Sequence, residues 1–448
     1  MIFSATNINY KILFAVFGLA LGILSIFVPE TIIFALLFLA VASIITFVNI
    51  SLSFSLFIVA MAIIPDIFWS NTFILGAAIF YWFIFILQYY IGRNNGINIQ
   101  LLPVSLVLYV IFCIISFFTG FGGLDSIRVA SILFSAISLS ILAANIINTR
   151  QKLHRLVLLI FVSLLLTSLY GILQFHTGIE IRTDFVDIMA NIGLPGRLYS
   201  TMGNPNNFAK FLTMFLPFCI SYILITKCNF RRLFLCLFIF PVIIALVLTF
   251  SRASYLAIAG IAFLFILFLK PRLIPIAFIL ALLLIPFLPE VLLMRISTIG
   301  TDSSSLYRIL IWEGSWRTVQ SYWSQGIGIG PAAFVMIYRA YANNMAGNAM
   351  HAHNVFLNVW IETGIGGLIA ILAYNFSTFR RGVTAFFNEE SDLKFYFVGG
   401  LSSLAGFIMF SLVEHVWFYP RTMLTYFISM GIIWATINIQ QKERGITK

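Results

Sequence analysis

Two histidines precede an apolar segment of the chain, GNAMHAHNVFLNVWIETGIGG, which runs from Gly347 to Gly367 and carries one glutamate. A neutral histidine can accept the proton of an attacking hydroxyl group, and the start of a membrane helix holds a side chain more rigidly than the tip of a loop does. Of the pair, His353 lies closer to the expected helix than His351. We therefore expect His353 to be a general base, with an interfacial histidine of no special role as the alternative.

The glutamate of this segment lies on a different helical face. Asn354, Asn358 and Glu362 recur every four residues and form one polar stripe. The nine residues from His353 to Glu362 place these two side chains on nearly opposite faces of a helix. We expect Glu362 to be a buried structural carboxylate bonded to a neighbouring helix, and the glycines that follow it to permit that close approach.

Several arginines are expected on the outer side of the membrane, where basic residues are normally depleted. A guanidinium group is planar and always charged, and it can hold two phosphate oxygens at once. Several of them around one outer pocket would suit a lipid-linked pyrophosphate. The alternative is that each pairs with a carboxylate such as Asp184, Asp187, Asp302 or Glu313. Pairing with a carboxylate nearby in the sequence does not explain Arg252, since no acidic residue lies within ten positions of it. The arginines concerned are Arg182, Arg197, Arg252, Arg308, Arg317 and Arg339.

A metal site is the competing chemistry. Asp184 and Asp187 have D-x-x-D spacing, which can supply oxygen ligands for a divalent ion but is common by chance. The sequence shows no cluster of cysteine and histidine of the kind that binds zinc. We expect neither a metal ion nor another cofactor.

The elements that position these residues are membrane helices. Of the 448 residues, 61% are hydrophobic and 9% are charged, whereas soluble domains average about 25% charged residues. Stretches of about 20 apolar residues, enough to cross the hydrocarbon as a helix, recur along the whole chain. We expect an all-α, polytopic integral membrane bundle of twelve to fourteen transmembrane helices, forming one membrane domain over residues 1–448. Spans are expected to begin near Ile12, Thr31, Leu52, Thr72, Leu101, Val129, Leu156, Asn207, Leu233, Ala253, Leu273, Asn354, Phe395 and Thr422, those near Leu52 and Leu273 being short.

The net charge of +11 follows the expected topology. When fourteen spans are threaded from a cytoplasmic start, the cytoplasmic face carries sixteen Lys and Arg residues against four acidic ones, and the outer face carries ten of each. This is the positive-inside pattern of short cytoplasmic loops, so nucleic acid is not an expected partner. Both termini are expected in the cytoplasm.

Two external loops, residues 176–206 and 289–353, are longer than the others. In the second, apolar side chains from Ile309 to Val319 recur at steps of three and four residues. This predicts an amphipathic helix that lies on the outer membrane surface or covers a cavity. A helix anchored only by interfacial tryptophans is the alternative. The following GIGIGP run is expected to form a tight, close-packing turn.

Five motifs between Gly203 and Leu368 resemble, in the same order, those of the bacterial O-antigen ligase and O-antigen polymerase superfamily. They read TMGNPNNFAKFL, LTFSRASYLA, SLYRILIWEGSW, GIGIGPAAF and HAHNVFLNVWIETGIGGL. The resemblance implies a metal-independent transferase of the GT-C-like helical type at the periplasmic face of the bacterial inner membrane. Its donor would be a glycan linked to undecaprenyl pyrophosphate, a membrane lipid.

The resemblance also assigns residues. The arginine of the family's SR motif falls on Arg252, that of its R-x-x-x-W motif on Arg308, and its catalytic histidine on His353. The two arginines would clamp the donor pyrophosphate and neutralise the charge that develops as it leaves, and the histidine would deprotonate the acceptor hydroxyl. Loop 289–353 would then be the catalytic loop. The substrate-binding residues expected around this site are Arg182, Arg197, Arg317, His351 and Asn354.

Three functions remain open. An O-antigen ligase would move a finished glycan to a lipid A-core acceptor; its pattern of His-Asn, nine residues and Gly-x-x-Gly begins at His353, but Leu368 stands where a small or aromatic residue is expected. An O-antigen or capsule repeat-unit polymerase would extend a growing glycan, and its pattern of an arginine, ten residues and a glycine occurs in both outer loops. A lipid-linked oligosaccharide flippase would need charges in a central cavity open to both sides, whereas the distinctive polar residues here gather on one side. We favour the ligase.

Overall fold

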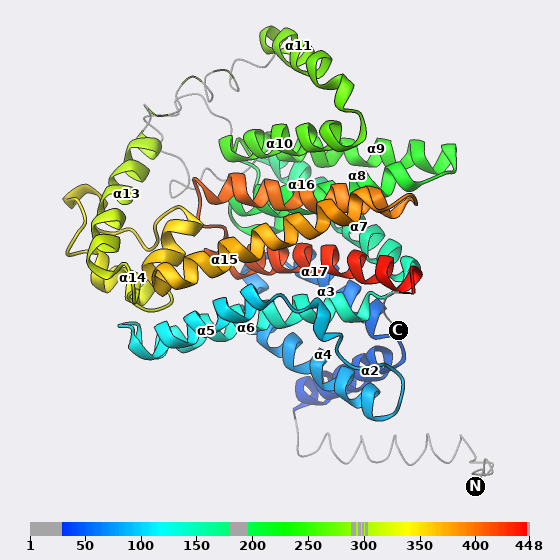
Figure 1. Ribbon diagram of the computed structural model, residues 1–448, viewed down its shortest axis with the longest axis horizontal. Coiled ribbons are helices and arrows are strands. Elements are labelled where there is room, and N and C mark those ends of the chain that lie inside the picture. The colour runs from blue at the N-terminus through cyan, green and yellow to red at the C-terminus, as the bar shows by residue number, and fades with distance from the viewer. Residues whose placement is uncertain are drawn as a thin grey trace.

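The computed structural model describes residues 29–178, 196–287 and 303–445, together with Leu293, Ser297 and Gly300. The regular structure of these residues is helical (Figure 1). The α-helices are α2 (Glu30–Val48), α3 (Ile50–Ile63), α4 (Thr72–Tyr90), α5 (Val104–Thr119), α6 (Gly123–Ile146), α7 (Arg150–Thr177), α8 (Pro205–Ile225), α9 (Asn229–Leu248), α10 (Arg252–Leu269), α11 (Ile274–Leu284), α13 (Ser303–Tyr322), α14 (Pro331–Tyr338), α15 (Val355–Phe387), α16 (Leu393–Ser411) and α17 (Pro420–Glu443). Short 3-10 helices lie at Asp66–Phe68, Ile99–Leu101, Ser200–Met202, Pro271–Leu273, Ile285–Phe287, Asn344–Ala346 and Val416–Phe418.

The predicted polytopic helical fold is confirmed. Among the described residues, nine helices are long and apolar enough to cross a membrane, and four shorter apolar helices accompany them. These helices coincide with every expected span except the one near Ile12, which lies outside the described residues. The two spans expected to be short are indeed α3 with 14 residues and α11 with 11 residues.

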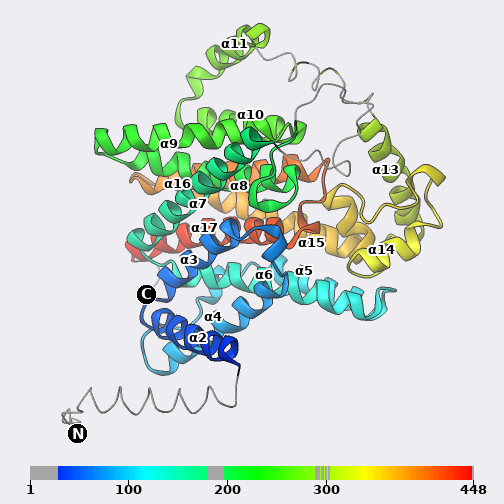
Figure 2. The same ribbon diagram turned by 180° about the vertical axis from the view of Figure 1, so that it is seen from behind.

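Helix α17 forms the centre of the bundle. Its most apolar window is entirely buried, and it packs against α6, α8, α15 and α16 (Figures 1 and 2). The peripheral helices α4, α9 and α10 bury only 33%, 22% and 28% of their apolar windows. Their exposed aliphatic and aromatic side chains suit a surface that faces lipid tails, where burial gives no hydrophobic advantage.

Local sequence signals fix the helix starts at one end of the bundle. Pro205 takes the first position of α8, and the Asn204 side chain caps that helix by accepting from two backbone N–H groups at 2.9 and 3.3 Å. Asn354 caps α15 in the same way, accepting from the N–H of Leu357 at 3.0 Å. Both starts lie at the end of the bundle that α13 and α14 flank, and the C-terminus lies at the other end (Figure 1).

Helix α15 is broken in its first third, where the glycine-rich loop that precedes α14 packs against it. Gly364 has a φ of 70° and a ψ of −178°, which only glycine adopts readily. The carbonyl of Ile361 accepts from the N–H of Ile327 at 2.8 Å, and the N–H of Ile365 donates to the carbonyl of Trp323 at 2.8 Å. The GIGIGP run and the residues just before it therefore do more than turn tightly, because their backbone groups pair with those that the helix break leaves open.

Glu362 fastens α15 to α14. Its Oε1 atom accepts from the N–H of Gly330 at 2.9 Å, and Gly330 is the N-cap of α14. The positive end of the helix dipole favours a carboxylate at that position. The backbone carbonyl of Glu362 also accepts from the hydroxyl of Ser116 on α5. The structural role predicted for Glu362 is confirmed.

The helix predicted in the second long loop is α13, and the residues of its predicted apolar stripe have two settings. Ile309 and Trp316 are exposed, whereas Val319 is buried together with Gly314 and Thr318. A Cβ atom at Gly314 would lie 2.9 Å from the ring of Tyr338 on α14, so the small size of Gly314 allows α13 to approach α14 closely. That the exposed side chains lie on the membrane surface or cover a cavity stays a prediction.

Candidate functional site

One buried carboxylate, Glu414, gathers polar side chains from three other segments of the chain. Glu414 lies in the turn between α16 and α17, and its Oε1 atom accepts from Arg308 Nη2 on α13 at 2.5 Å and from Asn206 Nδ2 on α8 at 3.3 Å. Its Oε2 atom lies 3.6 Å from Lys210 Nζ on α8 and 3.8 Å from His353 Nδ1. These five residues are called the Glu414 cluster.

The charges of the Glu414 cluster are held in a nearly closed environment. The Lys210 side chain is 2% exposed, that of Glu414 8% and that of Arg308 20%. Burial raises the pKa of the Glu414 carboxyl, but the charges of Arg308 and Lys210 outweigh burial and hold that pKa well below its ordinary value. Glu414 is therefore an anion at neutral pH, and two basic side chains, Arg308 and Lys210, share it.

His353 stands at the rim of the Glu414 cluster with its two ring nitrogens in different settings. Its Nδ1 atom is buried beside Glu414 and has no hydrogen-bond partner among the described residues, whereas Nε2 is not buried. The residue adopts a φ of 47°, a left-handed conformation that costs a non-glycine residue about 1–3 kcal/mol. The side chain is 26% exposed and its Nδ1 is buried, so Nε2 is the nitrogen available to a substrate.

Two further histidines, His351 and His415, lie next to this site, and the His351 ring packs against the rings of both His353 and His415. The His351 ring lies 4.2 Å from that of His353 and 5.4 Å from that of His415, measured between centroids. The Nδ1 atom of His351 accepts from the backbone N–H of His353 at 3.2 Å. Burial, followed by the nearby charges of His353 and His415, lowers the pKa of His351 well below its ordinary value. Burial, followed by the charge of Lys210, lowers the pKa of His415 to about 3. Both rings are therefore neutral at pH 7.

Arg197 connects the Glu414 cluster with the segment that leads into α10. Its Nη2 atom donates to Asn206 Oδ1 at 2.8 Å, and the amide of Asn206 in turn reaches Glu414. Its Nε atom donates to the carbonyl of Thr249 at 2.9 Å, three residues before Arg252. Arg252 itself is half-buried at the first position of α10. The structure thus brings Arg197, Arg308 and His353 together, and Arg252 belongs to a segment held by the same network.

Strained backbone marks the same region. Among the described residues, three non-glycine residues have positive φ values: Ser200 at 52°, Phe250 at 48° and His353 at 47°. Ser200 follows Arg197 by three residues, and Phe250 precedes Arg252 by two. Conformations of this kind persist only where surrounding contacts enforce them, and they concentrate at functional sites.

The other predicted site residues have different outcomes. Asn354 caps α15 and its Nδ2 atom donates to the carbonyl of Leu412 at 3.0 Å, so it ties α15 to the end of α16. Arg317 is exposed and lies nine residues after Arg308 on α13, on the opposite face. Its expected part in substrate binding stays a prediction. Arg182 and the candidate metal ligands Asp184 and Asp187 lie outside the described residues.

Lys210, Asn206 and Glu414 were not predicted from the sequence to be site residues. Lys210 lies four residues inside an expected span, and a charge in that position requires a partner. Glu414 is the acidic residue of the short connection between the last two spans. Each signal was present in the sequence, but nothing in the order of the chain indicated that these two residues, 204 positions apart, would pair.

Comparison with known families agrees with the motifs. Residues 212–372 match the family model described as O-antigen ligase. The matched stretch contains Arg252, Arg308 and His353, begins two residues after Lys210 and ends before Glu414. A comparison with curated proteins finds no match for the chain.

Proposed function

Because the chain carries a domain of the O-antigen ligase family over residues 212–372, we propose that it transfers a glycan from undecaprenyl pyrophosphate to a hydroxyl group of an acceptor sugar. The observation that carries this proposal is the contact between His353 and Glu414. It holds a candidate base beside the cation Arg308, which suits a pyrophosphate. The coarser conclusion, a multi-pass membrane enzyme of the ligase and polymerase type, rests on the family match and on the apolar helices.

In the proposed reaction, His353 Nε2 removes the proton of the acceptor hydroxyl as its oxygen attacks the anomeric carbon. The bond between that carbon and the phosphate oxygen breaks, the lipid pyrophosphate leaves with the bonding electrons, and the configuration at the anomeric carbon inverts. Glu414 Oε2, 3.8 Å from Nδ1, stabilises the imidazolium that forms. General-base assistance of this kind contributes about 10²–10⁴-fold to a rate.

The leaving group meets the guanidinium groups. Arg308 donates a hydrogen bond from Nη2 to Glu414. Its buried Nε–H group has no hydrogen-bond partner among the described residues, so this second donor can bind a phosphate oxygen. In this proposal Arg252 also binds the pyrophosphate. The hydrogen bonds from Arg197 to Thr249 and Asn206 hold the segment that contains Arg252 beside the Glu414 cluster. Positive charge placed where negative charge develops lowers the barrier without an added metal ion.

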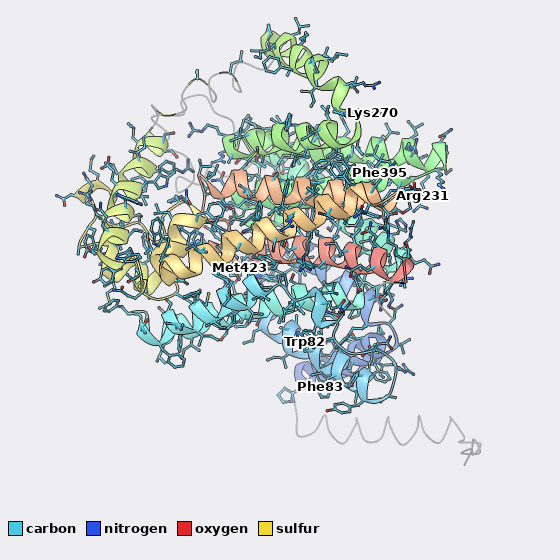
Figure 3. All side chains as sticks on the ribbon, viewed as in Figure 1. Trp82, Phe83, Arg231, Lys270, Phe395 and Met423 are labelled. Atoms are coloured by element: carbon cyan, nitrogen blue, oxygen red, sulfur yellow. The ribbon has the colours of Figure 1, made fainter. Side chains whose placement is uncertain are left out.

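The distribution of charge supports a periplasmic site. The end of the bundle away from α13 carries many basic residues, among them Arg231 and Lys270 (Figure 3). By the positive-inside rule we propose that this end lies in the cytoplasm together with the C-terminus, and that the Glu414 cluster lies at the periplasmic face of the bacterial inner membrane. The N-terminal residues lie outside the described part of the chain, and their expected cytoplasmic position remains part of the proposal.

Two acceptors fit this chemistry. The family description, O-antigen ligase, favours ligation of a finished glycan, and the acceptor that we propose for it is lipid A-core. Polymerisation of repeat units onto a growing glycan is the second candidate. A purified protein supplied only with lipid-linked repeat units separates them, because a polymerase lengthens chains without another acceptor. Movement of lipid-linked sugar between leaflets without formation of a glycosidic bond would instead support a flippase.

The decisive test uses His353→Ala in a reconstituted transfer assay that contains lipid-linked donor and acceptor. We expect a rate loss of about 10²-fold or more, with activity of the unchanged protein retained in a chelator. The matched control is His176→Ala, an exposed histidine at the end of α7, which should leave the rate unchanged. Full activity of His353→Ala, or strict dependence of the unchanged protein on magnesium, would contradict the mechanism.

A further inference from the structure

A basic groove lies between α15 and α17 at the end of the bundle opposite the Glu414 cluster. Its volume is about 570 Å³, and three arginines line it: Arg380 and Arg381 on α15, and Arg444 just beyond α17. None of the three forms an ion pair with a described carboxylate. Glu443, the neighbour of Arg444 in the chain, forms an ion pair with Arg150, whose Nε lies 2.6 Å from Glu443 Oε1. The groove therefore presents concentrated positive charge with no carboxylate from the described residues bound to it.

The groove continues into a strip of exposed apolar side chains along α15. Ile369, Leu372 and Phe376 are 59%, 44% and 68% exposed, and the next step of four residues leads to Arg380. The spacing of three, four and four residues puts all four side chains on one face of the helix. An amphiphile with an anionic head and an acyl tail matches this order of charge and apolar surface.

Two details show that the groove is shaped for more than loose ion attraction. The guanidinium of Arg381 lies over the ring of Trp434, 5.0 Å from its centroid, which fixes its orientation. Gln441 Oε1 is buried in the groove wall without a hydrogen-bond partner among the described residues. An acceptor left unsatisfied is unfavourable unless a donor reaches it, and the hydroxyl groups of a phospholipid headgroup are donors of suitable size.

We infer that this groove binds the phosphate headgroup of an anionic phospholipid, with one acyl chain lying along the Ile369–Phe376 strip. Basic pockets between membrane helices have this preference in general. The site lies in the leaflet opposite the proposed active site and does not depend on the proposed function, so that it can be tested whatever the protein transfers.

The test measures retention of phosphatidylglycerol by the purified full-length protein, with native mass spectrometry of mixed-lipid micelles. The variant is Arg380→Gln/Arg444→Gln, and the matched control is Lys270→Gln/Arg272→Gln, which removes two exposed charges near the same end outside the groove. Each lost cation near a lipid surface weakens binding by about one kcal/mol, so we expect about a 30-fold loss of affinity in the variant and no change in the control. Arg380→Lys/Arg444→Lys should recover most of the loss. An unfolding curve of Arg380→Gln/Arg444→Gln that matches that of the unchanged protein in lipid-free detergent shows that the groove variant is folded.

Further measurements distinguish a phospholipid headgroup from free inorganic phosphate as the ligand. Phosphatidylglycerol should raise the thermal unfolding temperature of the unchanged protein, whereas phosphatidylcholine and inorganic phosphate at equal concentration should not. Equal retention of phosphatidylglycerol by the groove variant and the unchanged protein would overturn the inference. Stabilisation by inorganic phosphate alone would overturn it as well, because the groove would then be a site for a free anion.

Discussion

Arg308 and Glu414, 106 positions apart in the chain, are joined by a hydrogen-bonded ion pair of 2.5 Å. One belongs to α13, outside the set of long apolar helices, and the other to the turn between two central helices. The pair therefore fastens the loop helix to the bundle at the point where His353 stands. Docking of α13 on the bundle therefore supplies Arg308 to the candidate site.

Loss of the central carboxylate should destabilise the fold. Glu414→Gln leaves Lys210 and Arg308 as buried cations without a countercharge, and breaking a buried pair in this way costs about 3–5 kcal/mol. The measurement is chemical unfolding of the protein in detergent. Lys210→Met in the Glu414→Gln background should restore part of the loss, because it removes one of the two uncompensated charges.

The matched control for that experiment is Glu313→Gln. Glu313 is an exposed carboxylate on α13, and its loss should change the free energy of unfolding by no more than about 0.5 kcal/mol. Equal stability of Glu414→Gln and the unchanged protein would mean that the carboxylate is not required to compensate Lys210 and Arg308.

Acidification should destabilise the protein through the buried histidines. The pKa of His415 falls from an ordinary value of 6.5 to about 3 in the fold, so between these values the unfolded chain binds a proton that the folded chain does not. Stability is then complete above about pH 6.5 and falls as the pH drops, by about 2 kcal/mol for this residue at pH 5. Unfolding curves between pH 7.5 and 5 measure the slope. His415→Phe keeps an aromatic ring against Phe418 and should flatten the slope; an unchanged slope would exclude His415 as its source.

Glu414 should act in a different pH window. Its pKa is held below the ordinary value, so its contribution to stability is complete above the unfolded-state pKa of about 4.3 and is lost as the pH falls toward the lower folded-state value. Below about pH 4.3 the unchanged protein should therefore lose stability more steeply than Glu414→Gln does. Parallel curves for the two proteins across this window would contradict the assignment of the shift to Glu414.

The sequence predicted the helices because apolar length is a local property. Each described span begins within six residues of its expected position, and the caps at Asn204 and Asn354 are of residue types that favour capping. His353 and Arg308 could be selected as well, because a family resemblance supplied their roles. What the sequence could not supply was the partner of each charge, since Lys210 and Glu414 meet only through the packing of α8 against α16.

The packing partner of α13 could not be predicted for a related reason. The steps of three and four residues predict an amphipathic helix, but they do not indicate that Gly314 allows close approach to α14, where small size matters more than hydrophobicity. Glu362 was predicted correctly as a carboxylate bonded to a neighbouring helix, and the structure identifies that helix as α14. Close approach of backbones depends on which surfaces meet, and a single chain pattern does not contain that information.

The helix break in α15 gives a further prediction. Gly364→Ala would place a side chain at φ 70° and ψ −178°, in a region that costs about 1–3 kcal/mol for any residue other than glycine, and its Cβ would collide with the backbone of Ser324. The control is Gly76→Ala in α4, where no atom lies within 4 Å of the added Cβ and where alanine should be neutral or stabilising by about 0.5–1 kcal/mol. Because the first half of α15 begins beside His353, Gly364→Ala should lower both the free energy of unfolding and the transfer rate. Unfolding curves and transfer assays of the two variants measure these effects, and a Gly364→Ala protein as stable as Gly76→Ala would show that the break is not required by the packing of the GIGIGP loop.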